Sequence, residues 1–283
     1  MKRILITGAD GQLGQCLRKI VSESSSHVFM FENRATLDIT DNNAVFAYFN
    51  RQNPDFCINT AAFTQVDLAE SQRKEAYQIN VEGVKNLIEA CEEFRVKLIH
   101  LSTDFVFDGS KKIPYLETDV PNPKTYYGQT KLEAEEWIQH NLEAHYILRT
   151  SWLYSEYGHN FMKTMLRLAN EKKKIRVVND QFGSPTSGED LAKAILAIVH
   201  SEENHYGLYH FSNFGETTWY GFAKEIFRQQ NLAIDLEAIQ TSDFPTAAAR
   251  PNYSVLNSSK FSKTFQFEVQ SWQNALQIVN KSL

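Results

Sequence analysis

A tyrosine and a lysine four residues apart are the residues of this chain best suited to chemistry. Tyr127 and Lys131 lie where a helical pattern begins, so they share one helix face. A nearby ammonium favours the phenolate and lowers the pKa of a tyrosine from about 10, which suits it to protonate a carbonyl oxygen that is becoming an alcohol. Two surface residues at helical spacing would look the same, so this prediction depends on the rest of the chain.

A hydroxyl residue closes the fourth predicted strand, Lys97–Ser102. Thr103 could bond a substrate carbonyl oxygen while Tyr127 protonates it. The simpler alternative is a strand-end threonine that satisfies local backbone groups. Asp104 follows, and because side chains alternate along a strand we expect it to point away from Thr103.

Three glycines separate the first predicted strand, Arg3–Thr7, from a helical pattern. The spacing G-x-x-G-x-x-G lets the backbone approach a pyrophosphate, whose charge the helix N-terminus stabilises. A tight turn without a ligand is the alternative, and the spacing alone does not name a cofactor. The predicted cofactor contacts in this loop are Gly8, Asp10, Gly11, Gln12 and Leu13.

The residues after the second predicted strand, His27–Phe31, should face the adenosine ribose of a dinucleotide. Glu32 could bond a ribose 2′-hydroxyl and favours NADH, whereas Arg34 could bind a 2′-phosphate and favours NADPH. The sequence leaves both cofactors open. Further cofactor contacts are predicted at Asp38, Ile39, Ala61, Ala62 and Thr64, although Asp38 could equally be a turn residue.

Bulk composition describes an ordinary globular protein of 283 residues, with 42% hydrophobic and 22% charged residues. The net charge of −5 gives no basic excess for nucleic acid or an anionic membrane. We find no transmembrane run and no export signal, and Cys16, Cys57 and Cys91 have no pairing pattern. We therefore predict a cytoplasmic protein that binds neither nucleic acid nor membrane.

The elements that must position these residues alternate between strands and helices. This alternation predicts an α/β fold, a Rossmann-type doubly wound parallel sheet, with a smaller α/β substrate-binding domain. We place the dinucleotide-binding domain at 1–150 and the mainly substrate-binding domain at 151–283, and we expect that the chain could cross between the lobes. The serine cluster Ser22–Ser26 predicts a loop. Strands are predicted at Phe56–Asn59, His145–Arg149, Ile175–Val178 and Leu208–Ser212, and helices at Asp41–Asn50, Lys74–Phe94, Asn160–Ala169, Glu189–His200, Trp219–Gln230 and Ser271–Val279.

The combined motifs resemble the extended short-chain dehydrogenase/reductase superfamily, and within it the dTDP-4-dehydrorhamnose reductase family. The superfamily resemblance depends on the glycine loop, Asn59–Ala62, Asn80–Gly83, Ser102–Asp104 and the Tyr127/Lys131 pair. The closer resemblance depends on Gly11–Gly14, Leu37–Thr40, Thr64–Glu70, Ser102–Phe107, Arg149–Tyr154, Asp180–Thr186 and Ala249–Pro251.

This resemblance implies that NADPH or NADH reduces the C4 keto group of dTDP-4-dehydro-L-rhamnose to dTDP-L-rhamnose. It makes Thr103, Tyr127 and Lys131 catalytic, with Lys131 holding the nicotinamide ribose and lowering the pKa of Tyr127. It implies substrate contacts at Thr103, Asp104, Trp152 and Arg250. Trp152 would pack on the sugar and Arg250 would bind the diphosphate, against the alternatives of core packing and a surface ion pair.

Two positions depart from the family pattern. Phe105 stands where the family often has tyrosine, and Gln15 where some members have an acidic metal ligand. We therefore predict no bound metal, and a monomer or weak homodimer. Two other functions are compatible with the resemblance: a dinucleotide-binding regulatory subunit like the methionine adenosyltransferase β subunit, and a sugar-nucleotide epimerase or dehydratase.

Overall fold

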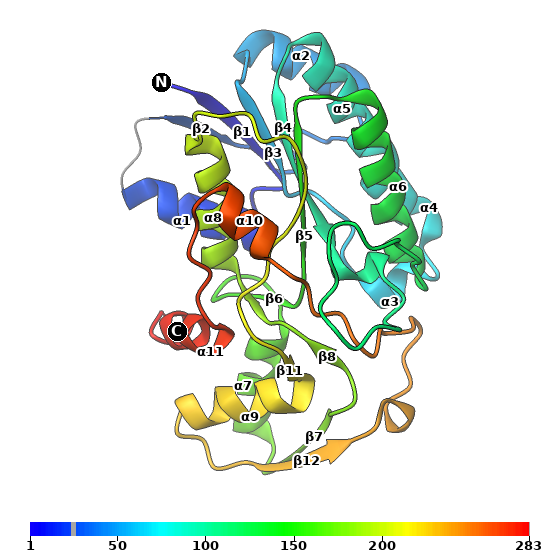
Figure 1. Ribbon diagram of the computed structural model, residues 1–283, viewed down its shortest axis with the longest axis vertical. Coiled ribbons are helices and arrows are strands. Elements are labelled where there is room, and N and C mark those ends of the chain that lie inside the picture. Colours follow the sequence, from blue (N-terminus) through cyan, green and yellow to red (C-terminus); the bar gives the residue numbers. More distant parts are fainter. Residues whose placement is uncertain (24–26, 283) are drawn as a thin grey trace.

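A parallel sheet of six strands forms the centre of the computed structural model, which describes residues 1–23 and 27–282 (Figure 1). The strand order β10-β5-β4-β3-β1-β2 changes direction at β1, as in a doubly wound sheet. The predicted fold class is confirmed. The strands are β1 (Arg3–Thr7), β2 (Val28–Phe31), β3 (Phe56–Asn59), β4 (Lys97–Thr103), β5 (His145–Thr150) and β10 (Gly207–His210).

Helices cover both faces of this sheet, each over its own apolar core (Figure 1). One face carries α1 (Gln12–Glu23), α8 (Gly188–His200) and α10 (Ser259–Thr264). The other carries α2 (Asn42–Gln52), α5 (Gly83–Glu93) and α6 (Tyr126–Asn141). Burial on both faces explains why the strands read as nearly continuous apolar runs. Of the loop predicted at Ser22–Ser26, the first two residues belong to α1 and the last three lie outside the described residues.

The prediction of one uninterrupted helix from Lys74 to Phe94 is wrong, because a π-helical turn divides it. The structure has α4 (Arg73–Tyr77), a π-helical turn η1 (Gln78–Glu82) and then α5. Asn80 lies inside the π turn, where its side chain hydrogen-bonds Phe63 N, Phe63 O and Thr130 Oγ1. These bonds satisfy an amide that is 1% exposed, and they make Asn80 a scaffold residue that ties the helix to the chain beyond β3.

A smaller lobe lies beyond the carboxyl ends of the strands and has a third apolar core (Figure 1). The chain enters it after β5 but returns, because β10 and α8 belong to the central sheet and its covering layer. The division at residue 150 stays a prediction. The lobe contains α7 (Phe161–Glu171), α9 (Trp219–Gln229), α11 (Trp272–Asn280), and the strand pairs β7/β12 (Lys174–Val178, Asp235–Ile239), β8/β11 (Phe182–Gly183, Thr217–Thr218) and β6/β9 (Leu153–Tyr154, Thr186–Ser187).

Short elements that the sequence did not predict complete the fold. They are α3 (Val66–Ala69), the 3₁₀ turns η2 (Asp104–Val106) and η3 (Thr241–Asp243), α10, and the strands β6, β8, β9, β11 and β12. Across the described part of the chain, none of the helices combines the length and the apolar character that crossing a membrane requires.

Candidate active site

The glycine loop joins β1 to α1 with almost no space for side chains. Gly8 has φ +64°, and a Cβ there would lie 2.6 Å from Ala61 N. A Cβ on Gly14 would lie 2.5 Å from Ala9 O, so only glycine lets α1 pack this closely on the turn. These contacts hold the N-terminus of α1 at the carboxyl edge of the sheet, where its unpaired N–H groups suit a phosphate.

Two adjoining cavities form a cleft along this edge, and they share Gly11, Thr60 and Ala62. Their volumes of about 430 Å³ and about 420 Å³ are in the range of ligand sites. Most of the predicted residues come together here. The first cavity is lined by Gly8, Asp10, Gly11, Arg34, Asp38, Ile39, Ala61 and Ala62, and the second by Gly11, Gln12, Leu13, Ala62, Thr64, Thr103, Asp104, Tyr127, Lys131 and Trp152.

Glu32 is not among the residues that line the cleft. Its carboxylate accepts a hydrogen bond at 2.7 Å from Oη of Tyr48, which lies in α2. The next residue, Asn33, lines the first cavity instead, and its Nδ2 donates to Asp10 Oδ2 at 2.7 Å. The ribose contact at Glu32 stays a prediction, although Asn33 is the residue of this turn that lines the cavity. Arg34 lines the first cavity and is exposed, and its guanidinium pairs with Asp38 at 3.3 Å and Glu75 at 3.8 Å.

Thr103 and Asp104 face the same cavity, contrary to the expected alternation. β4 ends at Thr103 and Asp104 begins η2, so the strand rule stops applying between them. Thr103 Oγ1 donates to Asp104 Oδ1 at 3.1 Å. Burial raises the pKa of Asp104 to about 6, although hydrogen bonds from Ser254 and Thr103 oppose the shift. The cleft is thus lined by a buried carboxyl group with a raised pKa.

Tyr127 lies in the first turn of α6, which begins after Thr125. The Thr125 side chain accepts from Gly128 N at 3.0 Å and so caps the helix. Burial raises the pKa of Tyr127 to about 12, a hydrogen bond with Thr103 opposes this, and the Asp104 charge reinforces it. The lowered pKa expected from Lys131 is therefore wrong for this arrangement, since loss of solvent favours the neutral phenol. A neutral phenol is the form that can donate a proton.

Lys131 lies one turn further along α6 and is 2% exposed. Its Nζ donates to Leu101 O at 2.6 Å and lies 3.0 Å from His100 Nε2. Burial lowers the pKa of Lys131 to about 8, and the Glu135 carboxylate opposes the shift. Tyr127 and Lys131 share one face of α6, as their spacing predicted. The Lys131 side chain, however, is hydrogen-bonded to the carbonyl of Leu101 in β4.

Trp152 reaches the second cavity from the first residues of the smaller lobe. Its backbone has φ +47°, a strained conformation for a bulky residue. The indole stacks on Trp219 with ring centroids 3.5 Å apart and 9° between the planes, and it also packs on Gly183. Trp152 is therefore held at the cleft between these two neighbours.

Arg250 does not reach either cavity of the cleft. It lines a separate cavity of about 110 Å³ next to Phe105. Its guanidinium forms two hydrogen bonds with the Asp67 carboxylate, at 2.7 and 2.5 Å, and Asp67 also accepts from Ala248 N. In this arrangement Arg250 forms the ion pair that was the alternative to a diphosphate contact. The pair connects the chain near residue 250 to α3.

Several cleft residues were missed by the sequence analysis. Thr150 ends β5 in register with Thr103, so the carboxyl-end rule that selected Thr103 could have found it. Ser102 Oγ and Thr150 Oγ1 are buried and have no hydrogen-bond partner among the described residues, which leaves them available to a ligand. His159 arrives from the loop before α7 and had no sequence signal.

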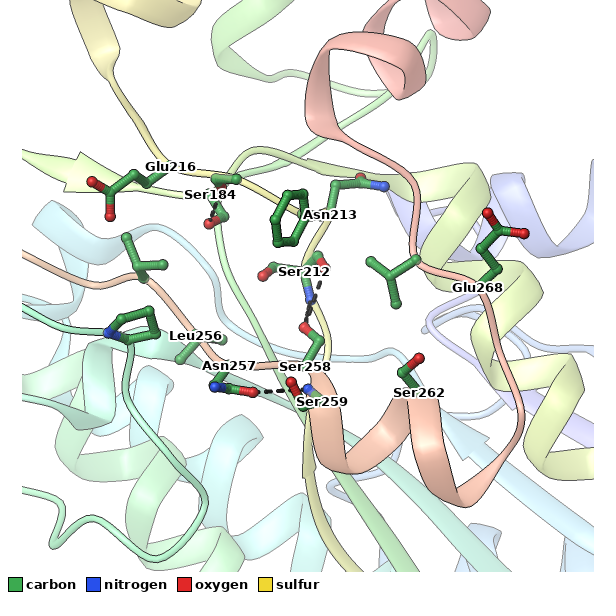
Figure 2. Close-up of a pocket in the computed structure, with 15 residues that line it drawn as sticks. Ser184, Ser212, Asn213, Glu216, Leu256, Asn257, Ser258, Ser259, Ser262 and Glu268 are labelled. Atoms are coloured by element: carbon green, nitrogen blue, oxygen red, sulfur yellow. Dashed lines mark hydrogen bonds between the residues drawn. The ribbon is translucent and has the colours of Figure 1, made fainter.

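A separate cavity of about 440 Å³ lies between the chain after β10 and α10 (Figure 2). It contains none of the predicted site residues. Its hydroxyl and amide groups bond one another: Ser212 N donates to Ser258 Oγ, and Ser259 N donates to Asn257 Oδ1 (Figure 2). Because Ser258 Oγ and Asn257 Oδ1 already accept hydrogen bonds and the predicted site residues lie elsewhere, the cleft is the better candidate for chemistry.

The doubly wound sheet, the glycine cradle and the adjacent Thr103, Tyr127 and Lys131 define the class of nucleotide-dependent oxidoreductases. The chain belongs to the family described as "RmlD substrate binding domain", whose model matches residues 1–283.

Named relatives and solved structures agree with this assignment. The dTDP-4-dehydrorhamnose reductase of Aggregatibacter actinomycetemcomitans is 40% identical, over 98% of this chain and 97% of that protein. The enzyme of the same name from Escherichia coli strain K12 is 38% identical, over 95% and 94%. The structure of dTDP-4-dehydrorhamnose reductase from Bacillus anthracis in complex with NADP has a TM-score of 0.95 and 37% identity, over 100% and 99%. The family resemblance predicted from the motifs is confirmed.

Proposed function

We propose that this protein is a dTDP-4-dehydrorhamnose reductase that uses NADPH or NADH to convert dTDP-4-dehydro-L-rhamnose to dTDP-L-rhamnose. The observation that supports this most is the cleft itself, with the glycine cradle in one cavity and Thr103, Tyr127 and Lys131 in the next. Relatives of that name match nearly the whole chain. The cradle fits a dinucleotide because Gly8 leaves no side chain between the loop and Ala61.

In this proposal the bound nicotinamide supplies the hydride, and the protein supplies placement and a proton. Tyr127 donates its phenolic proton to the C4 oxygen, as its raised pKa permits. Thr103 orients the same oxygen by turning its one hydroxyl proton to it from Asp104 Oδ1, which accepts that proton in the absence of substrate. Lys131 holds ribose hydroxyls, and Trp152 packs on the deoxysugar.

One assay tests the reaction. Purified protein is mixed with enzymatically generated dTDP-4-dehydro-L-rhamnose and either NADPH or NADH, and absorbance is followed at the nicotinamide band. We expect oxidation of at least one nucleotide and formation of dTDP-L-rhamnose. No oxidation of either would contradict the proposal, and tight dinucleotide binding without turnover would favour the regulatory-subunit alternative.

The proposal extends to the state of the protein in the cell. We infer a cytoplasmic enzyme that acts as a monomer or weak homodimer on a small-molecule substrate. The net charge of −5 supports solubility and opposes binding to nucleic acid or anionic membranes. Sedimentation velocity over a range of protein concentrations tests the oligomeric state, and a stable tetramer would contradict it.

A further inference from the structure

His159 lies on the loop between β6 and α7, where the small lobe meets the N-terminus of α1. The residues on both sides of it contact Gln12, the first residue of α1. Asn160 Nδ2 donates to Gln12 Oε1 at 2.7 Å, and a Cβ on Gly158 would lie 3.5 Å from Gln12 Cβ. His159 itself lines the second cavity together with Gly11 and Gln12. The loop therefore places an imidazole beside the glycine cradle.

The loop is held in this position by hydrogen bonds that do not involve the imidazole. Asn160 Nδ2 also donates to Ser155 O at 2.8 Å, and its Oδ1 accepts from Lys163 N to cap α7. The His159 side chain forms no hydrogen bond or ion pair with any residue in the ranges 1–23 and 27–282. Both of its ring nitrogens are therefore available to a ligand in the cavity.

A pyrophosphate in the cradle would have few positive charges nearby. Among the described residues that line the two cavities of the cleft, the basic side chains are those of Arg34, Lys131 and His159. Arg34 is paired with two carboxylates, and Lys131 donates to Leu101 O. His159 is the remaining one, and it lies beside the helix end at which a dinucleotide places its pyrophosphate.

We propose that His159 binds the pyrophosphate of the dinucleotide through a positively charged imidazole. The inference rests on the proposed function and adds a phosphate contact from the small lobe to the cradle of the large lobe. The proposed sugar-nucleotide substrate also carries a diphosphate, but the residues on both sides of His159 contact Gln12 at the cradle, which favours the dinucleotide. Affinity for the dinucleotide then rises as the pH falls and the imidazole gains its proton.

Other ionisable groups around the loop do not obscure this pH dependence. Glu156 and Glu189 share the Lys19 ammonium, at 2.8 and 3.3 Å. Burial raises the pKa of Asp104 to about 6 and lowers the pKa of Lys131 to about 8, so both also titrate in this range. A substitution of His159 leaves them in place, so their effects cancel when the variant is compared with the parent. The groups on the elements around the loop and facing the cavity are Asp10, Lys19, Asp104, Tyr127, Lys131, Glu156, Tyr157, Lys163 and Glu189.

Equilibrium titration of the purified protein with NADP⁺ or NAD⁺ tests the inference without turnover. His159→Gln keeps an N–H donor but cannot carry a charge. We expect its dissociation constant for the dinucleotide to exceed that of the parent about five- to tenfold at about pH 6, and about twofold or less at about pH 8. His140→Gln is the matched control, because His140 is exposed in the last turn of α6 and lines neither cavity of the cleft.

Titration with dTDP separates the two sources of diphosphate. We expect the dTDP affinity of His159→Gln to stay within about twofold of the parent, because the two ligands occupy separate parts of the cleft. The inference alone would be overturned if dinucleotide binding had the same pH dependence in His159→Gln and the parent, if the loss were confined to dTDP, or if His140→Gln lost as much. Failure of the parent to bind either dinucleotide would overturn it together with the proposed function.

Discussion

The two lobes hold their parts of the cleft in different ways. In the large lobe, Thr103 and Lys131 are nearly fully buried and hydrogen-bonded to neighbouring elements. In the small lobe, Trp152 depends on a strained backbone and one stacked indole, and Arg250 on an ion pair that is partly exposed. The difference indicates that the groups proposed to act on the carbonyl are held by hydrogen bonds of the sheet and α6, whereas Trp152, which is proposed to pack on the sugar, is held by ring packing between distant segments.

The largest effect on activity is expected from a substitution in the large lobe, at Tyr127. Tyr127→Phe removes the phenolic proton but keeps the ring that packs edge-on against Phe105. We expect the turnover number to fall by roughly 10²- to 10⁴-fold, the usual contribution of an acid catalyst, with dinucleotide affinity within about twofold. Steady-state kinetics and equilibrium titration of the nucleotide measure the two quantities.

Tyr126→Phe is the matched control for this variant. Tyr126 is the adjacent tyrosine, but its ring stacks under Arg73 and does not line the cleft. Its turnover number should stay within about twofold of the parent, since no proposed step uses it. Comparable losses in both variants would show that disturbance of α6, rather than loss of the proton, explains the result.

A smaller effect on activity is expected in the small lobe, where Trp152 stacks on Trp219 beside the cleft. Trp219→Leu leaves every cleft residue in place but removes the ring against which Trp152 stacks. An aromatic pair contributes about 0.5–1.5 kcal/mol, so we expect the KM for the sugar nucleotide to rise roughly two- to tenfold with little change in turnover number. Trp137→Leu, on the exposed face of α6, is the control. A KM unchanged by Trp219→Leu would show that Trp152 keeps its position without the stack.

The same comparison explains how far the sequence could predict the molecule. Parallel strands bring their carboxyl ends to one edge, so the glycine loop, Thr103 and the Tyr127/Lys131 pair could be placed together before the fold was known. The rule failed wherever the chain left a strand. Asp104 turns into the cleft because β4 has ended, and Asn33 replaces Glu32 because the chain bends after β2.

Residues of the small lobe were harder to predict because their positions depend on packing between distant segments. Trp152 reaches the cleft through contacts with Gly183 and Trp219, which lie far along the chain. His100, which lies 3.0 Å from Lys131 Nζ, was not predicted for a different reason: an interior strand position looks like core in a sequence.

The smallest effect on activity is expected from substitution of Arg250. This variant tests directly whether a small-lobe residue contributes to substrate binding. Because Arg250 is committed to Asp67 and lies outside both cavities of the cleft, we expect Arg250→Gln to change the KM by less than about threefold. The pair is partly exposed, so the free energy of unfolding should fall by about 1 kcal/mol or less. Kinetics and chemical denaturation measure both effects.

Asp67→Asn separates the two roles of Arg250. It removes the carboxylate partner but leaves the guanidinium in place, so an ion-pair role predicts the same small loss of stability in both variants. A diphosphate role predicts instead that Arg250→Gln alone raises the KM by tenfold or more, since a bidentate phosphate contact would be lost. That outcome would mean that the small lobe rearranges around the substrate, and that its recognition residues cannot be identified from their contacts in this arrangement.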